Sequence, residues 1–249
     1  MLMMKNSEVV LTYVKNMLMD AERIVCVVGH DIVTESGGMD IWERDEIYRI
    51  EKAYGESPEE LLSAGVFYSR TEEFYAFYRN EILAHLPKPG ITIEALKHLQ
   101  NLGKLKAVIS MNMYGLERLG GLENVIELQG SAHNAYCPIC KKRYPHEFLF
   151  EAKVPLCDAC KTAIRPGIRL FGERVRNDYL TMATKACSEA DVILVLGMNL
   201  SGSKVQYCTG HYKGKKLILV NNKPHYTDKY ADYVVEASPE KVMSSLLLE

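Results

Sequence analysis

Six short runs rich in Val, Ile and Leu recur along the chain, and most show no alternation of apolar and polar positions. Strands that are buried on both faces have this pattern. Because helical patterns separate nearly all of the runs, the sequence predicts a doubly wound α/β fold, in which helices cover both faces of a parallel sheet. The predicted strands are 24–28, 105–109, 124–128, 192–196, 216–220 and 232–236, and the predicted helices between them are 90–103, 114–120, 175–190 and 203–212.

Two stretches interrupt the alternation of strands and helices. Residues 42–87 are helical and aromatic in pattern, and residues 131–166 hold paired cysteines. We interpret them as insertions that together form a smaller domain beside a main domain of residues 1–41, 88–130 and 167–249. A packed core explains the aromatic stripe of the first insertion better than ligand stacking does. The stripe comprises Phe67, Tyr68, Phe74, Phe77, Tyr78 and Ile82.

The N-terminal segment and the charge balance narrow the class of protein. Charged residues interrupt each apolar run before it reaches the length of a membrane span or a signal peptide. Thirty Lys and Arg against thirty-two Asp and Glu give a net charge of −2, so no overall positive field favours nucleic acid or anionic lipid. We therefore expect a small-molecule or protein partner. The predicted N-terminal amphipathic helix carries Val10, Val14, Met17 and Leu18 on one face.

Four of the seven cysteines form two C-x-x-C pairs, Cys137 with Cys140 and Cys157 with Cys160. Two such pairs at this spacing supply four thiolates to a tetrahedral zinc ion and leave no open position, so the predicted site is structural. Four unliganded thiols, or a thioredoxin-like role for one pair, are weaker explanations. We expect the odd cysteine count to reflect a reducing cytoplasm. The remaining cysteines are predicted to be small buried residues: Cys26, Cys187 and Cys208.

The loop after the first predicted strand begins at Gly29 and runs to Gly38. In a doubly wound sheet this turn lies at the carboxyl ends of the strands, where helix N-terminal amides meet the phosphates of a ligand. The position suits a dinucleotide, although the usual G-x-G-x-x-G pattern is absent.

Several motifs follow one another in a fixed order. They are Gly29-x-x-Ile32-x-x-x-Ser36-Gly37, Ser110-Met111-Asn112, Glu127-Leu128-Gln129-Gly130, the two cysteine pairs and Arg165-Pro166-x-Ile168-x-x-Phe171-Gly172-Glu173. This ordered set resembles the sirtuin family. The similarity continues through Gly197-Met198-Asn199 and Asn221 and so covers essentially the whole chain.

The resemblance implies a Rossmann-type domain, a smaller domain built from a helical and a zinc-ribbon insertion, and a cleft where NAD meets an acyl-lysine. It implies that Phe171, Gly172 and Glu173 line the groove for a protein substrate. Turn chemistry is the alternative explanation for the glycines and asparagines of the set. The implied NAD-binding residues are Gly29, Ile32, Ser36 and Gly37 near the pyrophosphate and nicotinamide ribose, Asn112 in the nicotinamide and ribose pocket, and Gly197, Asn199 and Asn221 at the adenosine half. Their neighbours His30, Met111 and Met198 are further expected NAD-binding residues.

Gln129 stands where the family has a histidine. In the family's deacylation the acyl oxygen attacks the ribose carbon as nicotinamide leaves, and the histidine then removes a proton from a ribose hydroxyl. An amide cannot act as that general base, and loss of a general base commonly removes about 10² to 10⁴ in rate. His133 is a candidate for a displaced base, although a surface or zinc-module histidine is the stronger interpretation.

Other departures concern NAD binding directly. Tyr114 replaces an aspartate that contacts the nicotinamide amide, and Ile41-Trp42 replaces a Phe-Arg pair that closes the nicotinamide pocket. A carboxylate on Asp31 would repel a pyrophosphate that it faced, unless its side chain points away. A protonated His30 would compensate in part.

Three functions are consistent with these residues. The first is an NAD-dependent transferase that releases nicotinamide and passes ADP-ribose to a protein acceptor, because a macrodomain-linked branch of the family also has glutamine at this position. Asn112 and Gln129 would then be the catalytic positions. The second is an NAD-dependent protein-lysine deacylase, which needs a replacement base. The third is a noncatalytic module that binds NAD or ADP-ribose.

Overall fold

The computed structural model describes residues 2–5, 8–214 and 216–247 and contains a seven-stranded parallel sheet. All six predicted strands are present within two residues of their predicted ends. The sequence pattern missed the seventh, β1, because four residues rich in Met at the edge of the sheet carry little strand signal. In sheet order the strands are β1 (Leu2–Lys5), β10 (Tyr233–Glu236), β9 (Leu217–Val220), β8 (Val192–Leu196), β2 (Ile24–Val28), β3 (Leu105–Ser110) and β4 (Val125–Glu127).

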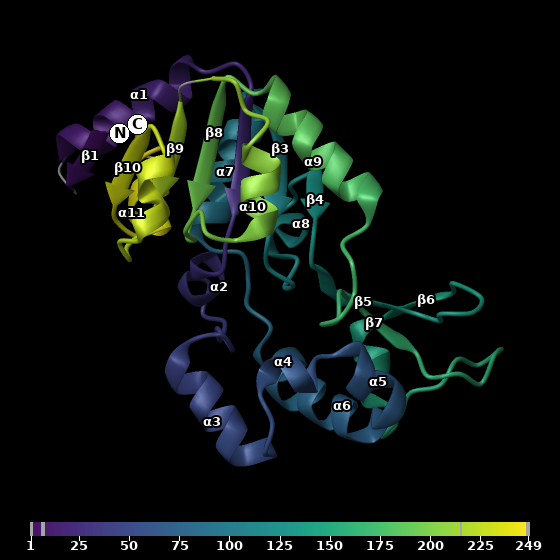
Figure 1. The fold of residues 1–249 in the computed structure, drawn as a ribbon. Coiled ribbons are helices and arrows are strands. Elements are labelled where there is room, and N and C mark those ends of the chain that lie inside the picture. The colour runs from purple at the N-terminus through teal and green to yellow at the C-terminus, as the bar shows by residue number, and fades with distance from the viewer. Residues whose placement is uncertain (1, 6–7, 215, 248–249) are drawn as a thin grey trace.

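Helices cover both faces of the sheet (Figure 1). Along β2, Ile24, Cys26 and Val28 enter one hydrophobic core, and Val25 and Val27 enter the other. This two-sided burial explains the uninterrupted apolar runs. The four apolar residues predicted for the N-terminal helix are all buried, as are Cys26, Cys187 and Cys208. The first core includes residues of α1 (Glu8–Asp20), α2 (Asp31–Glu35), α7 (Ile91–Asn101), α8 (Leu116–Leu119) and α11 (Pro239–Ser244), and the second includes residues of α9 (Asn177–Glu189) and α10 (Ser203–Thr209).

The order of the strands places a topological switch point between β2 and β8. From β2 the chain proceeds outward through β3 and β4, whereas from β8 it proceeds outward in the other direction through β9 and β10. Open parallel sheets bind ligands outside the carboxyl ends of the strands at such a point. The loops that follow Val28 and Leu196 therefore border the expected ligand cleft.

The helical insertion packs around its aromatic residues. Phe74 stacks on Tyr78, with ring centroids 5.6 Å apart, and meets Phe67 edge-on at 5.2 Å. These rings are buried, which supports the core interpretation, but Tyr68 is exposed. The insertion comprises α3 (Arg44–Tyr54), α4 (Pro58–Leu61), α5 (Ala64–Ser69), α6 (Thr71–Phe77), a π-helix (Tyr78–Ile82) and a 3-10 helix (Leu83–His85).

The cysteine-containing insertion forms a small antiparallel sheet in the order β6 (Arg143–Pro145), β5 (Gly130–Tyr136) and β7 (Arg165–Ile168), with a 3-10 helix at His146–Phe150. Arg79 of the helical insertion donates hydrogen bonds to three carbonyl oxygens here, those of Leu149, Ala152 and Lys153, at 2.8–3.1 Å. Figure 1 shows both insertions below the carboxyl ends of the large sheet. The exact domain boundaries stay a prediction.

Candidate functional site

The loops after β2 and β8 are in close contact. The Gly29 amide donates to the Leu196 carbonyl at 2.8 Å, and the Asp31 amide donates to the Gly197 carbonyl at 3.1 Å. A Cβ atom on Gly29 would lie 2.4 Å from both the Gly197 oxygen and the Met198 Cβ. Gly197 has a φ of +65°, which favours glycine. These two glycines thus permit the close approach of the two loops at the switch point.

A cavity of about 280 Å³ lies beside these loops, between the large sheet and the two insertions. Its wall is mostly apolar and carries a few polar groups, which is the usual composition of a small-molecule site. The predicted site residues His30, Met111 and Gln129 meet in this wall. The other lining residues are Trp42, Glu59, Leu62, Met113, Ile168, Arg169 and Phe171.

Arg169 fixes the side chain of Gln129. Its Nε donates to Gln129 Oε1 at 2.8 Å, and its guanidinium also donates to the Glu173 carbonyl at 2.7 Å. Burial lowers the pKa of Arg169, and no carboxylate within the described part of the chain forms an ion pair with it. Sequence reasoning passed over Arg169. The feature of the sequence that could have identified it is a basic residue between two apolar residues, Ile168 and Leu170, both of which are buried.

His30 lies in the same cavity wall; its carbonyl accepts from the Val33 amide at 2.8 Å, and its imidazole ring has no hydrogen bond within the described residues. Burial lowers its pKa, Asp40 opposes that shift and Lys204 adds to it. The imidazole is consequently neutral near pH 7. The positive charge on His30 that would compensate for Asp31 is therefore absent at this pH.

Asp31 packs against the neighbouring loop. Its Cβ lies 2.8 Å from where a Cβ on Gly197 would be, and its buried Oδ2 has no hydrogen-bond partner. Burial raises the pKa of this carboxyl, while Lys223 counters the shift. Its effect on a bound pyrophosphate stays a prediction.

Asn112 is buried, and its side chain is used within the protein. Its Nδ2 donates to Glu117 Oε1 at 3.0 Å, and its Oδ1 accepts from the Tyr114 amide at 2.9 Å. The Tyr114 hydroxyl in turn donates to the Met39 carbonyl at 3.1 Å. Asn112 therefore holds the turn that carries Met111 and Met113, two residues of the cavity wall. It does not line the cavity itself.

Asn199 and Asn221 also hold turns. Asn199 Oδ1 accepts from the amide and the hydroxyl of Ser201 at 2.9 and 2.6 Å. Asn221 donates to the Lys223 carbonyl at 3.1 Å and accepts from the Lys223 amide at 3.4 Å. This is the turn chemistry proposed as the alternative explanation. Any contact with NAD remains a prediction for both residues.

The remaining predicted residues of the first loop have different surroundings. Ile32 is buried in the core, where it helps to anchor α2. The Ser36 and Gly37 amides close the last turn of that helix by donating to the Ile32 and Thr34 carbonyls. Gly37 has a φ of +77°. None of the three lies in the cavity wall.

Phe171 joins the cavity to the helical insertion. Its amide donates to the Leu62 carbonyl at 3.0 Å, its carbonyl accepts from the Ala64 amide at 2.9 Å, and its ring lies 5.2 Å from that of Trp42. Glu173 instead turns away to pair with Arg165. Of the predicted substrate groove, the structure thus places only Phe171 in the cavity wall.

The four paired cysteines converge on one point, with their Sγ atoms all within 4.8 Å of one another. The Sγ atoms of Cys140 and Cys157 are 3.8 Å apart. A tetrahedral zinc ion with Zn–S bonds of about 2.3 Å requires sulfur atoms about 3.8 Å apart. The Tyr144 hydroxyl donates to Cys157 Sγ at 3.3 Å, as outer hydrogen bonds do at metal sites. The residues fit the predicted structural zinc ion.

Three comparisons agree with this geometry. The sequence model described as "Sir2 family" matches residues 29–204, more than half of the chain. The chain belongs to the Sir2 family. It is 32% identical to an NAD-dependent protein deacetylase of Clostridium acetobutylicum over 94% of this chain and 96% of that protein. It is 34% identical to a protein of the same name from Thermotoga maritima, over 83% and 84% of the two chains.

Solved Sir2 structures share the fold. One described as "The Structural basis of Sirtuin Substrate Affinity" matches with a TM-score of 0.84 at 30% identity, over 94% of this chain and 97% of the other. Another, described as "Sir2-p53 peptide-NAD+", matches with a TM-score of 0.80 at 29% identity, over 95% and 97%. The Sir2 fold and the zinc-type insertion predicted from the sequence are thus confirmed.

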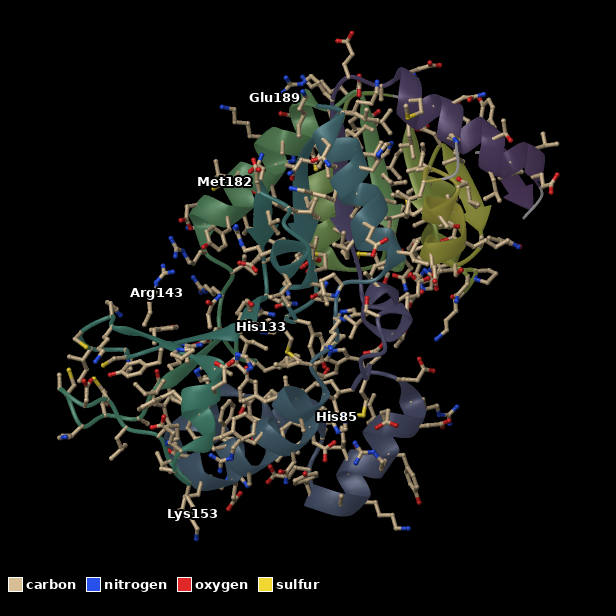
Figure 2. All side chains as sticks on the ribbon, turned by 180° about the vertical axis from the view of Figure 1, so that it is seen from behind. His85, His133, Arg143, Lys153, Met182 and Glu189 are labelled. Carbon is tan, nitrogen blue, oxygen red and sulfur yellow. The ribbon has the colours of Figure 1, made fainter. Side chains whose placement is uncertain are left out.

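His133 does not replace the histidine of the Sir2 family in this cavity. It lies on β5, and its ring packs edge-on against His146 with centroids 5.1 Å apart. Figure 2 shows His133 near the junction of the large sheet and the zinc insertion. It is not among the residues that line the cavity. The zinc-module interpretation of His133 therefore agrees with its position.

Arg169→Ala is expected to lower the free energy of unfolding by about 1–3 kcal/mol, because it leaves the Gln129 amide oxygen and the Glu173 carbonyl without their donors. Urea unfolding monitored by circular dichroism measures the change. Arg174→Ala is a matched control, since Arg174 is exposed and nearby. Equal stability of the two variants would show that the Arg169 hydrogen bonds contribute nothing measurable.

Proposed function

We propose that this Sir2 protein is an NAD-dependent protein-lysine deacylase. The observation that carries the proposal is the mostly apolar cavity at the switch point of the parallel sheet, against both insertions. Its Met111, Met113, Ile168 and Phe171 side chains suit the alkyl part and acyl group of a modified lysine. Relatives that match the chain almost end to end are named NAD-dependent protein deacetylases, which supports the same reaction.

NAD is the nucleotide that we propose for the cleft. The loops of Gly29 and Gly197 lie at the position where parallel sheets bind nucleotides, and they approach too closely for side chains larger than glycine. When bound, NAD would supply a ribose carbon activated by its bond to nicotinamide. The residues of the cavity wall would orient the acyl group toward that carbon.

The Gln129 side chain favours ADP-ribose transfer as a second candidate. Its amide is fixed by Arg169 and has no basic lone pair to remove a proton from a ribose hydroxyl. Transfer of ADP-ribose to a protein nucleophile needs the departure of nicotinamide but not that later proton transfer. A purely noncatalytic binding module would perform neither reaction.

We propose a cytoplasmic location for the protein. Within the described ranges 2–5, 8–214 and 216–247, no helix has the length and hydropathy of a membrane span.

One assay with two acceptors separates these functions. The protein is incubated with NAD and either an acetyl-lysine peptide or a mixture of unmodified proteins, and nicotinamide, peptide mass and protein-bound ADP-ribose are measured. We expect nicotinamide release that depends on the acyl peptide, together with an equal amount of deacylated peptide. Release with protein-bound ADP-ribose and no deacylation would favour the transferase. Binding of ADP-ribose without any nicotinamide release would contradict both enzymatic proposals.

A further inference from the structure

We propose that His30 is the general base of the deacylation, in place of the histidine that Gln129 replaces. This inference rests on the proposed deacylase function. His30 and Gln129 lie in the wall of the same cavity, although 99 positions separate them in the sequence. Among the titratable side chains of that wall, which are His30, Glu59 and Arg169, only an imidazole has an ordinary pKa near 7.

The surroundings of His30 leave its ring nitrogens available. His30 is the residue before α2, so the backbone of the loop next to Gly29 holds it at the carboxyl edge of the sheet. No described residue accepts or donates a hydrogen bond to its ring, and neither Glu59 nor Arg169 pairs with it. His30 is partly buried, and its ring nitrogens are not among the buried polar atoms without a partner, so a molecule in the cavity can reach them. An unpartnered ring in a ligand cavity is therefore ready to bond to a ligand hydroxyl.

The partial burial of His30 favours its proton-accepting form. Burial makes the largest contribution and lowers its pKa, Lys204 acts in the same direction, and Asp40 opposes both. The ring is consequently unprotonated at pH 7. It can take up a proton at that pH, whereas the Gln129 amide cannot.

In the second chemical step a proton passes from a ribose hydroxyl to His30. After the acyl oxygen has bonded to the ribose carbon and nicotinamide has left, the acyl carbon carries a C=N bond with a positive charge. The ribose 2′-hydroxyl oxygen forms a bond to that carbon, its proton passes to a ring nitrogen of His30, and the C=N π electrons move to the nitrogen. His30 becomes an imidazolium, and the positive charge has moved from the substrate to the side chain. Departure of nicotinamide precedes this step and requires no base.

The two steps give a direct test with His30→Ala and His30→Gln. We expect deacylation of an acetyl-lysine peptide at pH 7.5 to fall by about 10² to 10⁴ in both variants. Exchange of labelled nicotinamide into NAD in the presence of the peptide should stay within about threefold of wild type, because it reports only the first step. His133→Ala is the control, since His133 lies outside the cavity and should leave both rates unchanged.

Chemical rescue and a pH profile distinguish a base from a structural residue. Added imidazole should raise the deacylation rate of His30→Ala at least tenfold and should not accelerate wild type. Wild-type deacylation should fall once the pH drops below the pKa of His30, which burial holds below the ordinary value of about 6.5, because the proton-accepting form is lost there. Nicotinamide exchange should not show this loss. The wild-type profile needs no variant, so it tests the proposal even if His30→Ala folds poorly.

The possible failures are distinct. Deacylation by His30→Ala within threefold of wild type, or a wild-type deacylation rate that does not fall at any pH below 6.5 at which nicotinamide exchange persists, would overturn the role of His30 and leave the deacylase intact. Loss of nicotinamide exchange together with deacylation in a correctly folded His30→Ala would also overturn it, because the residue would then act before the proton transfer. Wild-type protein that releases no nicotinamide with any acyl peptide would overturn the deacylase proposal and this inference with it.

Discussion

Cys157→Ser is expected to reduce the zinc content from about one ion per chain to near zero and to unfold the insertion between residues 131 and 166. Cys157 is fully buried, and its sulfur lies 3.8 Å from that of Cys140. Structural zinc sites contribute about 10–16 kcal/mol of apparent binding free energy, and small zinc modules generally do not fold without the ion. The local apolar core of this insertion is small, so it cannot replace that contribution. Metal analysis and limited proteolysis measure the two effects.

Loss of the zinc ion should also disturb the cavity, although none of the four cysteines lines it. Ile168 and Arg169 line the cavity and lie at the end of β7, which pairs with β5 of the zinc insertion. Disorder of that sheet displaces this wall, so we expect loss of acyl-peptide binding and of NAD turnover. The first core of the large sheet extends into the zinc insertion, whereas the second contains no residue of 131–166, so the large sheet should retain most of the helical circular dichroism signal.

Cys187→Ala provides the matched control, because Cys187 is buried in α9, away from the four clustered thiols. It should keep one zinc ion per chain and its NAD turnover, with only a moderate loss of stability. A Cys157→Ser protein that is zinc-free yet resists proteolysis in the insertion would contradict the proposed structural role of the metal.

The architecture was readable from the sequence because its signals are local. Uninterrupted apolar runs such as 192–196 mark strands with two covered faces, and β8 is buried at every position. The spacing of the cysteine pairs is likewise sufficient to predict their convergence. Strand β1 was missed because it depends on pairing with β10, more than 220 residues away, and not on its own pattern.

The cavity was only partly predictable, because its wall combines residues that are distant along the chain. Gln129 and His30 were singled out, but their meeting depends on how the loop after β2 faces the end of β4. Arg169 is not one of the motif residues that define the family resemblance, so its hydrogen bond to Gln129 was not predicted. Asn112, Asn199 and Asn221 are turn residues whose side chains bond to nearby groups of the chain, which a motif alone cannot distinguish from ligand contacts.

Gly29→Ala is expected to weaken the binding of ADP-ribose by about ten- to a hundredfold and to lower the stability by about 1–3 kcal/mol. The added Cβ would lie 2.4 Å from the Gly197 oxygen and from the Met198 Cβ. Neither obstacle is the flexible end of a side chain, so the loops after β2 and β8 must separate. Calorimetry with ADP-ribose and thermal unfolding measure the two effects.

The comparison with Gly65→Ala isolates the cause. Gly65 lies in α5, and a Cβ there would meet only the Ser63 hydroxyl oxygen, at an ordinary 3.5 Å. Alanine also favours a helix more than glycine does, so this variant should be as stable as wild type or slightly more stable, with unchanged affinity. Wild-type affinity in Gly29→Ala would show that the contact of the two loops does not shape the nucleotide site. Weakened binding in that variant alone would tie NAD recognition to the close approach of Gly29 and Gly197, the feature that the switch point of this sheet requires.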